Sequence, residues 1–404
     1  MCACDAPWLS DLDGASTVQC SFLDFKPSPV SPCGPACVFH GGPSSVNTNW
    51  TSWGMSVIGP DAAGSFHGYV AEMANECDLG AWTKGSQVVH ASAATPLGPF
   101  SRGPAGSDVV VPAWAHNPQV IKAPDGTFAV FTLGDGWPQN GAPANCTKAA
   151  AAKSALVAAN MHALAAAAAA DGEPGAPARR GPLGRYGNCS VQDPQPNNCN
   201  PNPCWSCFVT VHTAEKLDAP GPWQPHTVQI NGLSNYDNLL NWNPAPLVLP
   251  NGSIGVMIHT NDNQGWSGES IAIADTWAGP FTVTVGNENI ANDPNSQEDP
   301  FMWIDKRGHW HTLVHRMFDP PGQGPCGTWA GGHLSSVDGL HWSAIYRAYN
   351  TSAALTDGSS VTWQRRERPK LLFDASGQMT HLFNGVISAD GKEVYTAVAP
   401  LNVV

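Results

Sequence analysis

The sequence predicts an all-β protein, a single five-bladed β-propeller over residues 1–404, and three observations carry this prediction. Only 13% of the residues are charged, about half the fraction of an ordinary soluble domain. The chain contains 41 Gly and 36 Pro, which is typical of many short strands joined by tight turns. Most importantly, one strand–turn–strand pattern recurs along the chain.

The repeat is a polar residue, a Pro, an apolar run and a Gly eight residues after the Pro. A second apolar run follows each Gly, so each copy is expected to form a β-hairpin. A degenerate fifth copy, without the Pro, runs from Trp53-Gly54 to Gly64. The four clear copies begin at Asn117-Pro118, Asn243-Pro244, Asp299-Pro300 and Arg368-Pro369.

A third strand and a closing turn follow four of the hairpins. The turns read TPLGPF, APGPW, WAGPF and VDGLHW, and the strands before them cover residues 86–92, 207–213, 270–276 and 333–337. Units of about 55 to 70 residues with at least three strands match four-stranded propeller blades. A β-sandwich with chance turns is the alternative, and four copies at fixed spacing argue against it.

Residues 138–206 are expected to form an insertion within blade two. It begins with an Ala-rich run, 149–170, which Lys153, Asn160 and His162 interrupt. Because Ala is weakly apolar, this run does not meet the requirement for a membrane span. A Pro/Asn-rich stretch follows, and its cysteines favour disulfides over a zinc knuckle or a redox pair, with Cys146 joining them. These cysteines are Cys189, Cys199, Cys204 and Cys207.

The even number of cysteines, twelve, indicates an oxidising compartment, so we expect a secreted protein or one in the endomembrane lumen. No signal peptide is visible at the N-terminus of this sequence. The net charge of -13 excludes nucleic acid as a partner, because phosphate binding needs clustered positive charge. Glycosylation is expected at sequons that begin at Asn49, Asn145, Asn188, Asn251 and Asn350.

In a propeller the innermost strands line a central channel, and the residues before each repeat Pro converge at one mouth. The second strand returns to the same mouth. Carboxylates there suit acid/base chemistry, amides and Arg bind hydroxyls, and Trp stacks on sugar rings, so we expect a carbohydrate substrate. Polar filling of a wet channel is the alternative. The convergent residues are Trp53, Glu72, His116, Asn117, Trp242, Asn243, His259, Glu298, Asp299, His315, Arg316, Glu367, Arg368 and Asn384.

The repeats, the GPF and GPW turns and the segment Glu298-Asp299-Pro300-Phe301 resemble the five-bladed glycoside hydrolases of family 43, most of all a eukaryotic branch of it. The resemblance extends from about Trp50 to Asn384, excluding the insertion. It implies a glycosidase with Glu298 as general acid. The family also has an Asp in blade one that acts as the general base, and an Asp in blade three that adjusts the pKa of the general acid. This chain has Gly54 and Asn243 at these two positions.

The second catalytic carboxylate must therefore come from elsewhere, and the candidates are Glu367, Asp299 and Glu72, in that order. We expect the neighbouring Arg366 and Arg368 to keep Glu367 ionised, and an apolar setting to raise the pKa of Glu298. An ion pair that serves only the fold is the alternative for Glu367.

No cofactor and no catalytic metal are required. Some related propellers hold a structural calcium in the channel, for which His259 and His315 would be ligands. A carbohydrate-binding propeller without catalysis is the alternative function, and an adhesion module is a third. The sequence does not specify the sugar, the linkage or the oligomeric state.

Overall fold

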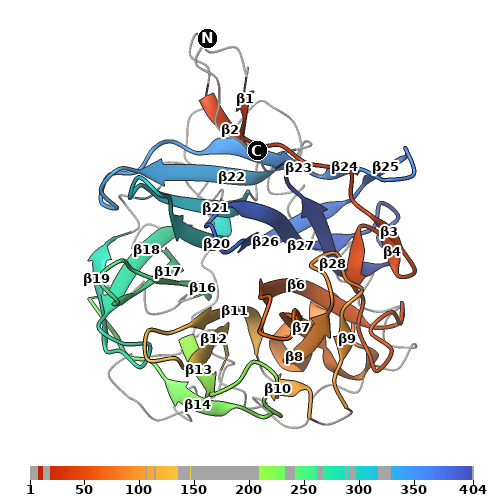
Figure 1. The fold of residues 1–404 in the computed structure, drawn as a ribbon, viewed down its shortest axis with the longest axis horizontal. Helices are drawn as coiled ribbons and strands as arrows, with labels where there is room; N and C mark the ends of the chain where they lie inside the picture. Colours follow the sequence, from red (N-terminus) through yellow and green to blue (C-terminus); the bar gives the residue numbers. More distant parts are fainter. Residues whose placement is uncertain are drawn as a thin grey trace, which may run out of the picture.

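The computed structural model describes residues 8–11, 19–104, 107–112, 115–134, 146, 209–232, 242–261, 267–286, 290, 297–316 and 329–402. Five sheets, antiparallel except for one parallel edge pair in blade three, stand around a central axis, as the repeat predicts (Figure 1). Each is a blade in which the first strand of the repeat hairpin lies nearest the axis. The chain is a five-bladed β-propeller.

Each predicted hairpin forms the two inner strands of a blade. These pairs are β6 (Thr51–Ile58) with β7 (Phe66–Met73), β11 (His116–Lys122) with β12 (Phe128–Leu133), β16 (Trp242–Val248) with β17 (Ile254–Asn261), β20 (Gln297–Ile304) with β21 (Trp310–Arg316), and β26 (Arg365–Phe373) with β27 (Met379–Ile387).

The outer strands complete the blades, and the predicted third strands are among them. They are β8 (Ser86–Ala93), β9 (Ser101–Arg102) and β10 (Val109–Val111); β13 (Val209–Ala214) and β14 (Gln224–Thr227); β18 (Ser267–Ala274), β19 (Phe281–Val285) and β15 (Ile230–Asn231); β22 (Trp329–Ser336) and β23 (Tyr346–Asn350); β28 (Val394–Pro400) and β5 (Cys37–Phe39).

Blade five joins the two ends of the described chain. Its outermost strand, β5, comes from the N-terminal region and pairs with β28. This pairing closes the ring, because it ties the first blade's leading segment to the last blade. Short hairpins and helical turns decorate the ring: β1 (Trp8–Asp11) with β2 (Gln19–Leu23), β3 (Val30–Ser31) with β4 (Gly34–Pro35), β24 (Ser352–Ala354) with β25 (Ser360–Thr362), η1 (Ala74–Glu76), η2 (Leu79–Ala81) and α1 (Trp82–Gly85).

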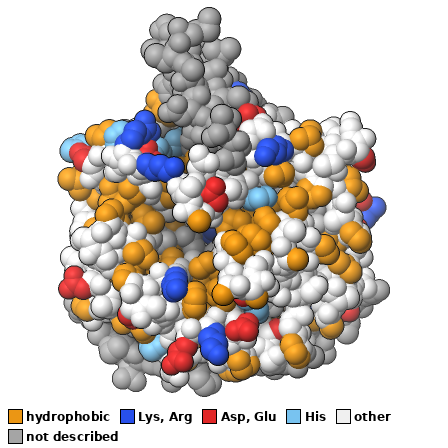
Figure 2. All heavy atoms as spheres, viewed as in Figure 1, with side chains coloured by type: hydrophobic (Ala, Val, Ile, Leu, Met, Phe, Trp, Pro, Cys, Tyr) orange, Lys and Arg blue, Asp and Glu red, His pale blue; other side chains and the backbone are white. Residues whose placement is uncertain are grey.

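The core lies between the blades. One cluster of buried apolar side chains fills each of the five gaps between neighbouring sheets. Both faces of a blade are therefore covered, which explains why β6 and β7 are buried along nearly their whole length rather than at alternate positions. On the surface viewed along the axis, hydrophobic side chains gather around the centre (Figure 2).

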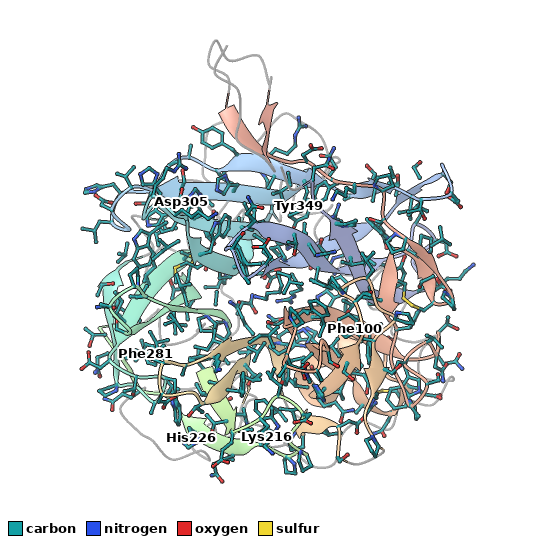
Figure 3. The ribbon with its side chains drawn as sticks, in the orientation of Figure 1. Phe100, Lys216, His226, Phe281, Asp305 and Tyr349 are labelled. Carbon is teal, nitrogen blue, oxygen red and sulfur yellow. A yellow bond between two sulfur atoms is a disulfide. The ribbon has the colours of Figure 1, made fainter. Side chains whose placement is uncertain are left out.

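The predicted closing turns place an aromatic residue in these gaps. Phe100, Trp223 and Phe281 follow the Gly-Pro pairs, and all three are buried. The backbone N–H of Phe100 donates to Val38 of β5, and that of Trp223 donates to Val110 of β10, in each case on the preceding blade. The turn thus anchors one blade to the next; Phe100 and Phe281 are labelled in Figure 3.

Two disulfides lie among the described residues. Cys33 is bonded to Cys37, and Cys77 is bonded to Cys146. The expectation that Cys146 pairs with the other cysteines of the insertion is wrong, because Cys146 forms its disulfide with Cys77, which follows β7. The Ala-rich run and the cysteines from Cys189 to Cys207 lie outside the described residues. Within the described part of the chain, no helix is long and apolar enough for a membrane span.

Blades one and four carry the same chain of titratable groups at the turn between their inner strands. His67 Nδ1 lies 2.9 Å from His90 Nε2, and His67 Nε2 lies 3.1 Å from Asp61. In blade four, His311 Nδ1 lies 3.0 Å from His333 Nε2, and Nε2 lies 3.3 Å from Asp305. Burial and the charge of His67 lower the pKa of His90 to about 4.

We predict that His90→Gln flattens the pH dependence of stability on the acid side. An unfolded His titrates near 6.5, so between about pH 6.5 and 4 the folded protein binds fewer protons than the unfolded chain. His90 therefore costs stability as the pH falls, by about 3 kcal/mol across that window. Urea unfolding of both proteins from pH 7.5 to 4.5 measures this slope.

His341→Gln is the control, because the side chain of His341 is 87% exposed. An unchanged slope in His90→Gln would contradict the prediction.

Candidate functional site

The innermost strand of every blade has a bulge at its channel end. The bulge lies just before the repeat Pro, or just before Met55 in blade one. The pairing register shifts there in all five blades. The residue at the bulge has a left-handed backbone, which Gly, Asn and Asp tolerate best. A bulge redirects its side chain, so these five positions face the axis. They are Gly54 (φ 77°), Asn117 (51°), Asn243 (60°), Asp299 (60°) and Arg368 (58°).

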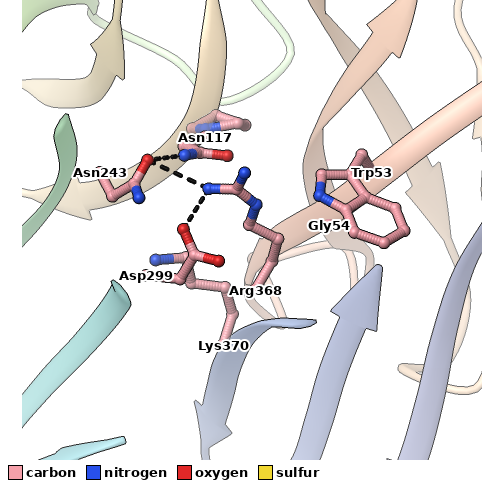
Figure 4. Close-up of a pocket in the computed structure, with 8 residues that line it drawn as sticks. Trp53, Gly54, Asn117, Asn243, Asp299, Arg368 and Lys370 are labelled. Carbon is pink, nitrogen blue, oxygen red and sulfur yellow. Dashed lines mark hydrogen bonds and ion pairs between the residues drawn. The ribbon is translucent and has the colours of Figure 1, made fainter. Parts of the chain in front are cut away.

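The five bulge residues line one pocket, together with Trp53, Pro118 and Lys370 (Figure 4). Arg368 crosses the axis. Its Nη1 donates to Asp299 Oδ1 and, at 3.1 Å, to Asn243 Oδ1. Asn117 Nδ2 also donates to Asn243 Oδ1. The remaining space is enough for about one water molecule.

Gly54 makes room for Arg368. A Cβ at Gly54 would lie 2.7 Å from the Cβ of Arg368, closer than packed atoms allow. The residue expected at this position from the family resemblance is an Asp. The Gly in blade one and the Arg in blade five therefore belong together: the small residue leaves the space that the large one fills.

Beside the pocket, four groups form the carboxylate cluster, which we define as Glu298, Asp299, His315 and Glu367. One carboxylate oxygen or ring nitrogen from each residue lies within 4.8 Å of those of the others. His315 bridges the cluster, with Nδ1 3.3 Å from Glu298 and Nε2 3.4 Å from Glu367. The side chains of Glu298 and His315 are 15% and 12% exposed, whereas Asp299 and Glu367 are 2% exposed. A ligand entering the mouth would therefore meet Glu298 and His315 first.

The arginine beside Glu367 is not the expected one. Arg365 Nε donates to Glu367 Oε1. Arg366 points to the other face of the strand, where it donates to Asn384 and packs over Tyr349. The expectation for Arg366 is wrong because side chains alternate along a strand, so Arg365 and Glu367 share a face. Arg368 pairs with Asp299 instead.

The pKa values of the cluster also differ from expectation. Burial alone would raise the pKa of Glu298, but the hydrogen bond with His315 and the charge of Arg368 hold it below its ordinary value. Burial raises the pKa of Asp299 to about 7, helped by Glu298 and opposed by Arg368. Burial lowers the pKa of His315, but Glu367 and Glu298 outweigh this and raise it. The cluster thus combines a carboxylate whose pKa is lowered with a carboxyl group and an imidazole whose pKa values are raised.

A second tier of polar groups lies one step further along the inner strands, and the sequence reasoning missed it. Lys370 Nζ donates to Gln119 Oε1 at 2.9 Å and to the Pro300 carbonyl at 3.1 Å. Burial lowers the pKa of Lys370 to about 7. Lys370 and Gln119 each lie two positions after the bulge residue of their strand. Their position in the repeat could therefore have predicted that both point into the channel.

Several expected site residues have other partners. Glu72 is fully buried and is held by Arg102, Gln87 and the Gly42 amide, away from the carboxylate cluster. His116 is hydrogen-bonded to Ser86 at 2.7 Å. Glu72 therefore no longer qualifies as the second catalytic carboxylate.

Others lie behind or beside the cluster. Asn384 donates to the Glu367 carbonyl, and His259 pairs with Glu269, a residue that sequence reasoning missed. Arg316 ends β21 opposite Gln297. Trp242 begins β16, and its side chain lies outside the described part of the structure.

Trp53 does not present its ring to a sugar. It lines the pocket, but it is only 1% exposed. The guanidinium of Arg365 lies over the ring, 5.4 Å from its centre. Arg365 on one side and the apolar cluster with Met73 and Cys77 leave no ring face for the sugar stacking that the sequence suggested.

The described residues of the channel do not favour the structural calcium that the family resemblance allows. Calcium prefers six to eight oxygen ligands, whereas His259 and His315 offer ring nitrogens already engaged with carboxylates. Two of the three carboxylates of the cluster pair with arginines. The axis itself carries Arg368 and Lys370, whose charges would repel a further cation.

Comparison with known proteins identifies the fold. No protein-family model matches the chain, and no curated protein sequence matches it. The structure is similar to a family 117 glycoside hydrolase of the marine bacterium Zobellia galactanivorans, with a TM-score of 0.53 and 13% identity over 94% of this chain and 90% of that one.

Two fungal enzymes are similar to the same degree. The catalytic domain of a GH62 α-L-arabinofuranosidase from Coprinopsis cinerea matches with a TM-score of 0.54 and 12% identity. An α-L-arabinofuranosidase from Podospora anserina, solved in complex with cellotriose, matches with a TM-score of 0.54 and 8% identity. Both matches cover 94% of this chain and 98% of the other. The predicted resemblance to five-bladed glycoside hydrolases is confirmed for the fold.

We predict that Gly54→Ala destabilises the protein by about 2 kcal/mol more than Gly126→Ala. Both glycines have positive φ, so both variants carry backbone strain. Only at Gly54 does the new methyl group meet another side chain, whereas nothing lies within 4 Å at Gly126. Overpacking of this kind costs about 1–3 kcal/mol. Urea unfolding of the two variants makes the comparison, and equal losses would contradict it.

Proposed function

We propose that the chain is a glycoside hydrolase that cleaves a glycosidic bond at the channel mouth. The observation that carries this proposal is the carboxylate cluster: carboxyl groups from blades four and five lie within 4.8 Å of one another, in a fold shared with glycosidases. Paired carboxylates are the usual machinery of this reaction.

Glu298 is the proposed general acid, acting together with His315. Glu298 is the most exposed carboxylate of the cluster. Because its own pKa is lowered and that of His315 is raised, the proton rests on the imidazole side of the pair before substrate binds. It passes from His315 Nδ1 to Glu298 Oε1 and from there to the oxygen of the leaving group.

Glu367 is the proposed second carboxylate. Its ion pair with Arg365 fixes its position, and its nearest oxygen lies within 4.8 Å of that of Glu298. Since His315 lies between the two carboxylates, it must turn aside when Glu367 acts.

A carbohydrate-binding propeller without catalysis is the second candidate. Three features favour it: His315 fills the space between Glu298 and Glu367, Gly54 and Asn243 replace acidic residues, and Arg368 neutralises Asp299. Such a protein would bind sugars at the same mouth and turn none over. The two disulfides support an oxidising compartment for either candidate.

We predict that Glu298→Gln lowers kcat by about 10²–10⁴-fold, the usual contribution of a general acid, and leaves folding intact. Release of reducing sugar from a panel of plant and algal polysaccharides and chromogenic glycosides measures turnover. Glu215→Gln, at an exposed position in the turn after β13, is the matched control. Undiminished activity in Glu298→Gln would remove the acid assignment, and sugar binding by a wild type without turnover would establish the second candidate.

A further inference from the structure

The mouth of the channel is rich in cations although the chain as a whole is acidic. The net charge of the protein is -13. Around the pocket, however, the carboxylates Glu269, Glu298, Asp299 and Glu367 interact electrostatically with several basic groups. This set of groups consists of His259, His315, Arg365, Arg368 and Lys370. Basic side chains therefore oppose the carboxylates at the mouth, and among them Arg365 and Arg368 stay positively charged at neutral pH.

Arg365 is the cation of this set that a ligand can reach. Its side chain is 46% exposed, compared with 13% for Arg368. Two contacts fix it: Nε donates to the buried Glu367, and the guanidinium lies over the ring of Trp53. Among the described residues, its two terminal nitrogens have no hydrogen-bond partner, so the outer edge of the guanidinium is available.

At this place the guanidinium of Arg365 is exposed, where a site for neutral sugars would expose an aromatic ring. A sugar with apolar faces stacks on an exposed aromatic ring, but Trp53 is 1% exposed beneath Arg365. The same place offers a planar cation whose parallel N–H groups match two oxygens of a carboxylate or a sulfate. An arginine held in place by two contacts also loses less side-chain entropy on binding than a free one.

We propose that Arg365 forms an anionic subsite beside Glu298, and that the substrate is an acidic sugar carrying a carboxylate or a sulfate. The anionic group would bind the two terminal nitrogens of Arg365, and the neighbouring glycosidic oxygen would face Glu298. This inference rests on the proposed function for its catalytic meaning, but binding alone is enough to test it.

The test is calorimetric binding in the Glu298→Gln background, so that no ligand is consumed. One arm compares oligogalacturonate with its methyl ester, and the other compares sulfated with desulfated galactan oligosaccharides. We expect the charged member of one pair to bind at least about tenfold more tightly, and the preference to weaken as salt is raised. The arm that shows the preference identifies carboxylate or sulfate.

Three variants in the same background assign the effect to Arg365. Arg365→Gln is expected to abolish the preference, and Arg365→Lys to retain only part of it because the ammonium lacks the planar fork. Arg307→Gln removes one exposed positive charge from a turn of blade four and should leave the preference unchanged. Thermal unfolding verifies that each variant is folded, since Arg365→Gln leaves Glu367 without its partner.

Equal binding of charged and neutral ligands, no binding of any of the four, or a preference that survives Arg365→Gln would overturn the subsite. Wild-type turnover separates this result from the proposed function. Turnover that depends on Glu298, without a preference for the anionic ligand, would support the proposed glycosidase and refute the proposed subsite. An Arg365-dependent anionic preference without turnover would leave the subsite and remove the glycosidase.

Discussion

The ion pair between Arg368 and Asp299 is the interaction on which the centre of the molecule depends. It joins blades five and four across the axis, and Asn243 and Asn117 extend it to blades three and two. Blade one contributes a glycine that leaves the space. Because Asp299 is buried and Arg368 is only 13% exposed, loss of either partner would leave a largely uncompensated charge, and breaking a buried pair in this way costs about 3–5 kcal/mol in proteins. The five blades are thus tied at the axis by polar groups and in the gaps between them by apolar ones.

The same ion pair determines the electrostatics of the candidate site. Arg368 is a bulge residue that pairs with Asp299 of the carboxylate cluster, and its charge lowers the pKa of Glu298 and opposes the rise in that of Asp299. The raised pKa of His315 follows from its place between two carboxylates. Buried carboxylates that interact this strongly titrate as a unit. The chemistry of the mouth therefore belongs to the cluster and not to any single residue in it.

The geometry differs from a plain pair of catalytic acids in a specific way. The positions that would carry acids in blades one and three hold Gly54 and Asn243, while cationic side chains from blade five, Arg365 and Arg368, reach the same mouth. The mouth thus has fewer acids than the resemblance implies, and two of the acids that remain are paired with arginines. The proposed anionic subsite rests on the exposed member of these two arginines, Arg365.

The sequence by itself determined the propeller, because the sequence of each blade contains a strand–turn–strand repeat, and most blades end in a turn with an aromatic residue. The pattern located the bulge positions, and with them Glu298, Asp299 and Glu367 at one mouth. Only the tertiary structure decided which groups meet across blades. The pairing of Arg365 rather than Arg366 with Glu367 follows from strand alternation at a register that the pattern did not specify. The exclusion of Glu72, the burial of Trp53 and the bond from Cys77 to Cys146 depend on side chains and segments far apart in sequence, and these distances are fixed only when the ring closes.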